Sequence, residues 1–368
     1  MLAWRRIRQE VGSRARGGGL EVIGWQASAL AAGGGMAANS EGGIVRKTLT
    51  RAMKASRRRV VVAGAGAVLA AAGALAGPST AAAAPPDRVV DCSSASLQTA
   101  IDRAPPGTRL LVNGTCTGQF TIGKNLSLLG QGTSGAVLDA DGALWSLQVN
   151  PRATVSVSNL TITGADGPGI DNRGTLSLTG STVSDNRGFD GGGIDNAGSL
   201  TVRASTVTRN TASFGAGGIA SIDRPELPTP RLTVQDSTVS DNYGEFGAGG
   251  ISSGGDVPMT LSNTRVTGNS SRSGAGGILA GGETTLNDST VSGNTTQFNG
   301  GGIFVNILAD DGNTLTLINT TVSGNTAGQA GGGIANVFSA PVVLRNATVT
   351  NNTPDNCAPA GSVAGCSG

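Results

Sequence analysis

Short segments with alternating apolar and polar residues recur along this chain at nearly regular intervals. The segment STVSDNYGEFGAGGI begins at Ser237, and near-copies begin at Ser181, Ser205, Thr264 and Ser289. Each copy contains one Val near its start and, after a run of small residues, an Ile. Alternation with a period of two is typical of a strand with one buried face. Repetition with the apolar residues in register predicts a solenoid of stacked coils.

The spacing of three alternating motifs defines the coil. The apolar strand LTV at 200–202 is followed by Val207 of a Thr-Val-Ser type motif, and then by Ile219 of a Gly-Gly-Ile motif. The same two steps recur in the other coils, with one step from Val to Ile shorter by a single position. By contrast, the step from the Ile to the next strand varies, being short after Ile194 and long between Ile219 and Leu232. Two corners are therefore fixed in length and one accepts insertions. Coils that stack at about 4.8 Å require corners of constant length wherever one turn lies directly on the next. We therefore predict a right-handed parallel β-helix with three short strands per coil.

Two residue columns support the stacking. The third position after the Val is Asn in seven coils: Asn186, Asn210, Asn242, Asn269, Asn294, Asn325 and Asn352. Stacked asparagine amides form hydrogen bonds along the axis and satisfy turn backbone. The fifth position before the Ile is Phe189, Phe214, Phe246 or Phe298 in four coils. We expect these rings to stack and to pack internally, with an exposed sugar-binding platform as the alternative.

Segments outside the repeats are predicted to cap the solenoid, because end coils would otherwise expose their core. The segment LQTAIDRA, with apolar residues at helical spacing, predicts a capping helix with Ser94 or Ser96 as its N-cap. We therefore assign 85–158 to the N-terminal cap and first coils, 159–352 to regular repeats, and 353–368 to a short C-terminal tail that acts as a cap.

Residues 1–84 are of another kind. A basic stretch from Met53, an apolar run from Val60 to Ala76 and Ala-x-Ala sequences near Ala84 are typical of a secretory signal peptide at 53–84. The alternative is a membrane anchor, although the apolar run is short and mostly Ala and Gly. Residues 1–52 are either an extension without structure or an incorrectly assigned start. We expect a secreted or cell-surface protein with no permanent membrane span after processing.

Composition narrows the chemistry. The 368 residues include 60 Gly and no His, whereas Gly usually makes up about 7% of a chain. Glycine fits tight turns and close backbone approach, and we expect Ser and Thr to face outward. The segment 1–84 holds 12 of the 26 Lys and Arg but only 3 of the 24 Asp and Glu. The remainder therefore carries a net charge of −7, which argues against nucleic-acid binding.

The four cysteines lie on either side of the repeats. Cys92 and Cys116 precede them, and Cys357 and Cys366 follow them. An even number of cysteines in an exported protein predicts disulfides. We prefer the local pairs Cys92–Cys116 and Cys357–Cys366 among the three possible connectivities, since the two pairs lie at opposite ends of the array; a metal site is the alternative.

The array resembles the parallel β-helix of the pectate-lyase-like superfamily, in the form found in secreted bacterial repeat proteins rich in GGGI, TLTL and STVSGN. The segments KNLSLLG at 124–130 and NLTITG at 159–164 resemble the opening coils of that group. The resemblance covers residues 90–368 approximately and implies an all-β fold. It implies no single activity, because the superfamily includes lyases, hydrolases and members of unknown activity.

Enzyme motifs of the superfamily are mostly missing. Polygalacturonase-type members share Gly-His-Gly and Arg-Ile-Lys segments, and the chain has neither. Pectate lyases use Ca²⁺ held by carboxylates and an arginine base in an Arg-x-Pro-x-x-Arg type segment. The segment RPELPTPR at 224–231 differs from that pattern in register. We interpret it as a structural insertion in the variable corner.

One acidic cluster is a candidate site. Asp171 and Asp195 directly follow the inward-facing Ile of successive coils, so we expect both carboxylates to point outward about 5 Å apart. Paired carboxylates hold Ca²⁺ or share acid–base work. The candidate catalytic residues are Asp171, Asp195 and Arg173, and the candidate metal ligands are Asp171, Asp190 and Asp195. The alternative is a surface column without a function.

Two classes of function remain. The first is a secreted, non-catalytic β-helix, expected to be a monomer, that binds polysaccharide or a cell-surface component. The second is a polysaccharide lyase or glycoside hydrolase that acts on acidic polysaccharide with Ca²⁺ as its cofactor. Outward positions are mostly Ser, Thr and Asn, and Lys124 is the single Lys after residue 84. This scarcity of charged catalytic groups favours the first class.

Overall fold

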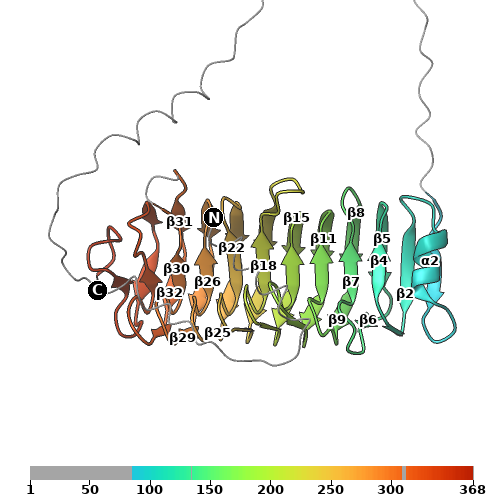
Figure 1. Ribbon diagram of the computed structural model, residues 1–368, viewed down its shortest axis with the longest axis horizontal. Helices are drawn as coiled ribbons and strands as arrows, with labels where there is room; N and C mark the ends of the chain where they lie inside the picture. Colours follow the sequence, from blue (N-terminus) through green and yellow to red (C-terminus); the bar gives the residue numbers. More distant parts are fainter. Residues whose placement is uncertain (1–84, 134, 309–311, 368) are drawn as a thin grey trace, which may run out of the picture. The chain divides into compact units, whose positions relative to one another are not determined.

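The computed structural model describes residues 85–133, 135–308 and 312–367. Within these ranges the chain forms a parallel β-helix whose coils follow one another along a single axis, with one α-helix at its start (Figure 1). The predicted fold class is confirmed. The extension predicted at 1–52 and the signal peptide predicted at 53–84 lie outside the described residues. In the described part, no helix combines the length and the apolarity that crossing a membrane requires.

The strands form four parallel sheets, and each sheet receives its strands from successive coils. Sheet A consists, in spatial order, of β1 (Arg88–Asp91), β2 (Arg109–Asn113), β5 (Leu126–Gly130), β8 (Thr154–Ser158), β11 (Thr175–Thr179), β15 (Ser199–Arg203), β19 (Arg231–Gln235), β23 (Met259–Ser262), β27 (Thr284–Asn287), β31 (Leu315–Ile318) and β35 (Val342–Arg345). Sheet B consists of β3 (Thr115–Thr117), β6 (Ala136–Asp139), β9 (Leu160–Thr163), β12 (Thr182–Ser184), β16 (Thr206–Thr208), β20 (Thr238–Ser240), β24 (Arg265–Thr267), β28 (Thr290–Ser292), β32 (Thr321–Ser323) and β36 (Thr348–Thr350).

Sheet C contains the Gly-Gly-Ile motifs. It consists of β4 (Phe120–Ile122), β7 (Leu147–Val149), β10 (Ile170–Asn172), β14 (Ile194–Asn196), β18 (Ile219–Ile222), β22 (Ile251–Gly254), β26 (Ile278–Ala280), β30 (Ile303–Val305), β34 (Ile334–Ala335) and β37 (Cys357–Ala358). Sheet D is a fourth, narrow sheet of β13 (Arg187–Gly188), β17 (Thr211–Ala212), β21 (Tyr243–Gly244), β25 (Ser270–Ser271), β29 (Thr295–Thr296) and β33 (Thr326–Ala327). The three predicted strands per coil therefore omit sheet D, because two-residue strands are too short to show an alternating pattern.

Backbone conformation explains why two corners have a fixed length. The residue three positions before each sheet-B Val has a positive φ, as at Ala204 (φ 46°) and Asp236 (φ 51°). The residue two positions after that Val is also left-handed, as at Arg209 (φ 53°) and Asp241 (φ 56°). A left-handed residue at a constant place makes the same bend in every coil. An inserted residue would move that bend out of line with its neighbours.

The predicted asparagine column is confirmed as a buried hydrogen-bonded ladder. The Nδ2 of Asn269 donates to Asn294 Oδ1 at 3.0 Å and to the carbonyl of Val239 in the preceding coil at 2.9 Å. Its own Oδ1 accepts from both the backbone N–H and the Nδ2 of Asn242, at 3.1 and 2.9 Å. Each side chain therefore joins neighbouring coils and satisfies turn backbone that is shielded from water.

Glycine before the sheet-C Ile leaves room for this ladder. A Cβ placed on Gly250 would lie 2.7 Å from the Gly277 carbonyl oxygen, 3.0 Å from Val266 Cγ1 and 3.1 Å from Asn269 Nδ2. The backbone approaches the amide too closely for any larger residue. The high glycine content and the asparagine column are thus parts of one packing arrangement.

A second ladder was missed by the expectation that Ser and Thr face outward. The residue directly before the Thr-Val-Ser motif is buried, and its hydroxyl accepts the backbone N–H of the equivalent residue in the preceding coil. Ser181 N–H donates to Ser205 Oγ, and Ser205 N–H donates to Ser237 Oγ, both at 3.1 Å. At the left-handed corner, the parallel strand pairing gives this backbone N–H no carbonyl acceptor. The serine hydroxyl of the next coil accepts its hydrogen bond instead.

The N-terminal end is closed by α2 (Leu97–Arg103), as predicted. Its N-cap is Ser96, whose side chain accepts the N–H of Thr99, and Leu97 and Ile101 are buried on the first coil. Lys124 Nζ donates to the carbonyls of Asp102 and Ala104 at the helix end, both at 2.9 Å. The single Lys after residue 84 therefore stabilises this cap.

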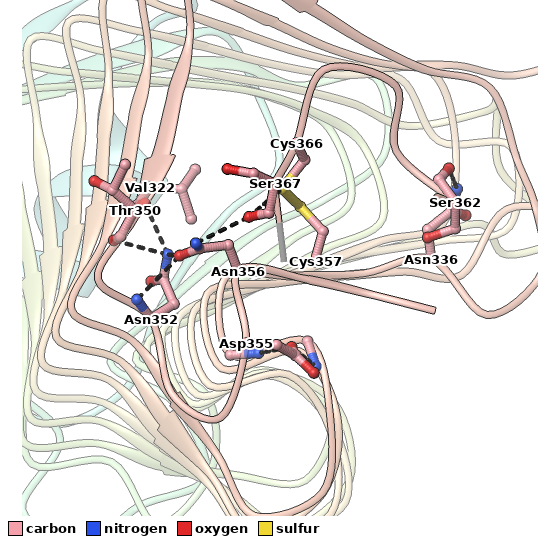
Figure 2. The surroundings of a disulfide bond; sticks show 12 residues. Val322, Asn336, Thr350, Asn352, Asp355, Asn356, Cys357, Ser362, Cys366 and Ser367 are labelled. Atoms are coloured by element: carbon pink, nitrogen blue, oxygen red, sulfur yellow. Dashed lines mark hydrogen bonds between the residues drawn. A yellow bond between two sulfur atoms is a disulfide. The ribbon is translucent and has the colours of Figure 1, made fainter. Parts of the chain in front are cut away.

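The C-terminal tail ends the asparagine ladder. The predicted disulfides Cys92–Cys116 and Cys357–Cys366 are both present, and the second closes the tail (Figure 2). Asn356, next to Cys357, accepts the N–H and Nδ2 of Asn352 through its Oδ1 and donates to Ser367. The tail thus supplies the acceptor that a following coil would otherwise provide.

We predict that Asn269→Ala lowers the free energy of unfolding by roughly 1–3 kcal/mol, because it removes the acceptor of the buried Asn242 backbone N–H and the side-chain donor to the Val239 carbonyl. Asn287→Ala, in the next coil but outside the ladder, is the matched control and is expected to change stability little. Chemical or thermal unfolding of the two variants is the measurement. Equal losses in both would contradict a stabilising role for the ladder.

Candidate functional site

The candidate carboxylates are brought together by strand register in sheet C. In β10 and β14, Asp171 lies directly beside Asp195, and Ile170 lies beside Ile194. Both isoleucines are fully buried in the core, so the two aspartates leave the opposite face of the sheet. The neighbouring coils place Gln148 and Ala220 in the same column. Two acidic residues therefore lie in adjacent coils between uncharged neighbours.

The two carboxylates leave the outer face of the sheet, as expected, but they are buried there and do not form an exposed surface column. Asp171 is 5% exposed and Asp195 is 8% exposed. Asp171 accepts a hydrogen bond from Gln148 Nε2 at 2.8 Å. Its two oxygens also accept from Arg173, whose Nε lies at 3.2 Å and whose Nη2 lies at 2.8 Å. Cationic and amide side chains thus cover a face that the strand pattern alone predicts to be open.

Arg224 covers the second carboxylate and comes from the insertion at 224–231. Its Nη2 lies 2.6 Å from Asp195 Oδ2 and 3.9 Å from Asp190 Oδ2. The interpretation of the insertion as merely structural therefore missed a residue of the cluster. The sequence carries no usable signal for this contact, because a need for a cation follows only from the burial of the carboxylates, which the strand pattern does not contain.

The pairing of Asp195 with Arg224 is incomplete. Asp195 Oδ1 and Arg224 Nε are both buried, and neither has a hydrogen-bond partner. A guanidinium and a carboxylate usually form two parallel hydrogen bonds, but here one guanidinium nitrogen supplies the contact to Asp195. Arg173 thus pairs with Asp171, and Arg224 pairs with Asp195.

These surroundings raise the pKa of Asp195 from 3.8 to about 6. Burial is the largest cause, because it disfavours the charged form, and the nearby carboxylates of Asp190 and Asp171 act in the same direction. Arg224 opposes them without reversing the shift. For Arg224 itself, burial would lower the pKa, but the three carboxylates outweigh it and the pKa is raised. The cluster thus contains a carboxyl group that titrates near neutrality.

The three aspartates, as placed, do not fit Ca²⁺. Calcium takes six to eight oxygen ligands, whereas Arg224 Nη2 contacts both Asp190 and Asp195. Across 85–133, 135–308 and 312–367, no group of three or more acidic, Cys or His side chains has the geometry to hold a metal ion. The side chains nearest the carboxylates are cations and amides, which suits recognition of a charged group.

The phenylalanine column is stacked but exposed, so the expectation of internal packing is wrong. Phe189 and Phe214 stack with ring centroids 5.3 Å apart, and Phe214 and Phe246 follow at 5.9 Å. Phe189 is 53% exposed and Phe246 is 56% exposed. Phe298 is also exposed.

We predict that stability falls as the pH rises from 3.8 to about 6, because the folded protein holds the Asp195 proton more tightly than the unfolded chain. The stabilisation from protonated Asp195 is complete below the ordinary pKa of an aspartate and is lost as the pH passes the raised pKa of the folded protein. The stabilisation is on the order of 3 kcal/mol. Asp195→Asn should flatten the curve of unfolding free energy against pH in this interval.

Asp185→Asn is the control, since Asp185 is an exposed carboxylate whose pKa is lowered by Arg209. We expect Asp185→Asn to lose stability between pH 3.8 and about 6 in the same way as the wild type. Parallel curves for wild type and Asp195→Asn would show that Asp195 does not titrate in this range.

Comparison with known proteins supports the fold. No known protein family and no curated protein matches the sequence. Pectate lyase Pel9A matches with a TM-score of 0.52 at 14% identity, over 74% of this chain and 81% of that chain. The alginate lyase from Paenibacillus sp. str. FPU-7 has a TM-score of 0.35 at 13% identity, over 71% of this chain and 99% of that chain. The Dettilon tailspike protein has a TM-score of 0.38 at 13% identity, over 73% of this chain and 64% of that chain. At these identities the likeness concerns architecture alone: the chain has the parallel β-helix fold of pectate lyase Pel9A.

Proposed function

We propose that this protein is a secreted, non-catalytic β-helix that binds polysaccharide along the column formed by Phe189, Phe214 and Phe246, which we call the phenylalanine ladder. The observation that carries the proposal is the exposure of more than half of the surface of its two outer rings. The three rings are in contact, so the apolar surface is continuous over three coils. Continuous exposed apolar surface is typical of a binding site.

A polysaccharide suits this ladder because sugar rings are amphipathic. Their C–H surfaces cover aromatic rings, while their hydroxyls bond to polar groups beside them. In sheet D, directly before the ladder residues in each coil, Arg187, Thr211 and Tyr243 carry polar groups that can bond to such hydroxyls. A linear ligand that runs along the axis would contact the same kind of residue in each coil. The likeness to a structure named pectate lyase is in keeping with a polysaccharide partner.

Secretion and the lack of catalysis rest on separate observations. Two disulfides fit an oxidising compartment. Lyase chemistry at a uronate needs a base and a cation for the substrate carboxylate. The chain has no His, and its one Lys after residue 84 holds the helix cap. Arg173 and Arg224 are paired with Asp171 and Asp195. The binding function therefore has more support than catalysis.

We predict that Phe246→Ala weakens binding to a retained polysaccharide by roughly tenfold, because stacking on one aromatic ring contributes on the order of 1 kcal/mol or more. Affinity electrophoresis over a panel of neutral and charged polysaccharides is the measurement. Phe338→Ala is the control, since Phe338 is an exposed ring outside the ladder that contacts Phe304. Binding that is unchanged by Phe246→Ala but lost with Phe338→Ala would place the binding site at Phe304 and Phe338 instead of the ladder.

A second candidate is a polysaccharide lyase or hydrolase with its active site at Asp171, Asp195 and Arg173. One observation favours it, namely the raised pKa of Asp195 beside a second carboxylate, which is a common property of catalytic acids. We expect no activity on uronate polymers. The measurement is ultraviolet absorbance of unsaturated product from polygalacturonate and related polymers, with and without added Ca²⁺. A signal that disappears in Asp171→Ala/Asp195→Ala would reject the non-catalytic proposal.

A further inference from the structure

The column that contains the phenylalanine ladder has one more ring beyond a single interruption. Strands β21, β25 and β29 of sheet D pair in register with one another. Phe246, Ser273 and Phe298 each come two residues after their strand, so Ser273 lies between phenylalanines of the coil before and the coil after. The backbones that carry the two rings are two coils apart, which corresponds to about 10 Å. We call the position of Ser273 between the two rings the ladder gap.

The exposure of the rings reflects the ladder gap. Phe214 lies between two rings and is half-buried, whereas Phe246 has a single ring neighbour and keeps 56% of its surface exposed. Phe298 is 40% exposed and contacts no other aromatic ring within the described ranges. The two sides of the ladder gap are therefore formed by rings that no third ring covers there.

Polar groups lie at the base of the ladder gap. Ser273 is half-buried, and its Oγ donates to the Glu245 carbonyl at 3.2 Å. Arg272, directly before it, is exposed and pairs through Nη1 with Glu245 Oε1 at 2.8 Å. Because these two charges pair with each other, the gap offers hydrogen-bonding groups without a net charge. A flat, uncharged ligand with apolar faces and a polar edge fits this combination.

Stereochemistry decides which sugar fits between two phenylalanines. In a β-glucosyl residue every hydroxyl is equatorial, so both faces of the ring show C–H groups and the hydroxyls lie at the edge. A galactosyl or mannosyl residue carries one axial hydroxyl, which would press a polar group against an aromatic face without a hydrogen-bond partner. A ring at the ladder gap would lie about 5 Å from each phenylalanine. This spacing is close to the 5.3 Å between the stacked rings of Phe189 and Phe214.

We propose that the ladder gap binds one β-glucosyl ring at the end of a polysaccharide chain, held between Phe246 and Phe298 with its hydroxyl edge toward Ser273. This inference rests on the proposed function and specifies its ligand. Rings bound the gap on both sides along the axis, so a sugar enters it from solvent as the end of a chain. The rest of the chain extends over the phenylalanine ladder. Ser273 is the specificity-determining position, because a larger side chain there would take the place of the sugar.

The test fills the ladder gap with an additional ring. Ser273→Phe introduces the residue found at this position in both neighbouring coils, and the Gly-Ala pair that follows Ser273 also follows Phe246. We expect this variant to raise the midpoint of thermal unfolding by a few degrees through ring stacking. It should weaken binding of a β-1,4-linked glucose oligomer by roughly tenfold, because the stacking site is taken.

Gln329→Phe is the matched control, since Gln329 is the exposed residue at the same position in the coil after Phe298. It adds a ring outside the ladder gap and should leave binding unchanged. Oligomers of glucose, galactose and mannose with the same length and β-1,4 linkage are titrated into wild type and variants. We expect wild type to bind the glucose oligomer roughly tenfold more tightly than the other two. Equal affinity for the three oligomers, or unchanged glucose binding in Ser273→Phe, would overturn the proposal.

The outcomes also separate the ladder gap from the binding function on which it rests. Ser273→Phe joins Phe298 to the ladder, so a polysaccharide that binds only along the ladder would bind this variant equally or more tightly. Weakening in Phe246→Ala without weakening in Phe298→Ala would keep the ladder and reject the gap. Methyl β-glucoside that binds as tightly as the oligomer and is lost in Ser273→Phe would keep the gap and reject the ladder. Absence of glucose-oligomer binding would reject the gap, while the polysaccharide panel still tests the ladder.

Discussion

The hydrogen bonding between coils determines the rest of this structure. A coil has almost no contacts of its own, so its turns are stable only if each polar group finds a partner in the next coil. The buried asparagines provide those partners at the tightest corner, where Asn269 both accepts from Asn242 and donates to Asn294. This requirement fixes the length of two corners and demands glycine beside the amide at Gly250. Variation is left to the third corner, which carries Arg224.

The sequence predicts the features that repeat, because repetition shows what each coil must satisfy. The inward Val and Ile columns, the asparagine column, the capping helix and both disulfide pairs all follow from spacing. Sheet D does not, since strands as short as Tyr243–Gly244 show no alternation. The buried Ser ladder was missed for a related reason, because a serine with a buried hydroxyl looks like any outward serine in a strand pattern. The burial of Asp171 and Asp195 depends on contacts across coils that no local pattern contains.

The carboxylate cluster shows how an insertion changes the chemistry of a regular surface. A repeated strand offers only a few side-chain types at each position, and an isolated buried charge on it would be too costly. The coil with the insertion at 223–230 follows the two acidic coils, so its arginine can lie across them. A buried group that titrates near neutrality thus arises on a fold that contains no histidine. The same residue pairs with Asp195, so the electrostatics of the site depend on one loop in the corner of variable length.

The asparagine ladder has a direction, and this has a consequence for how such a protein changes size. In the bonds between asparagine side chains, each Nδ2 donates to the Oδ1 of the following coil, from Asn186 to Asn210 and onward to Asn352, whose acceptor is Asn356 in the tail. The two ends are therefore not equivalent, and a coil added beyond the tail would face an acceptor that is already occupied. A duplicated internal coil, by contrast, would accept on one side and donate on the other without disturbing either cap. Duplication of a gene segment that encodes an internal coil is thus a route by which the protein can lengthen. The asparagine of each new coil would pair with the asparagines on both sides and so fix the strand register of that coil.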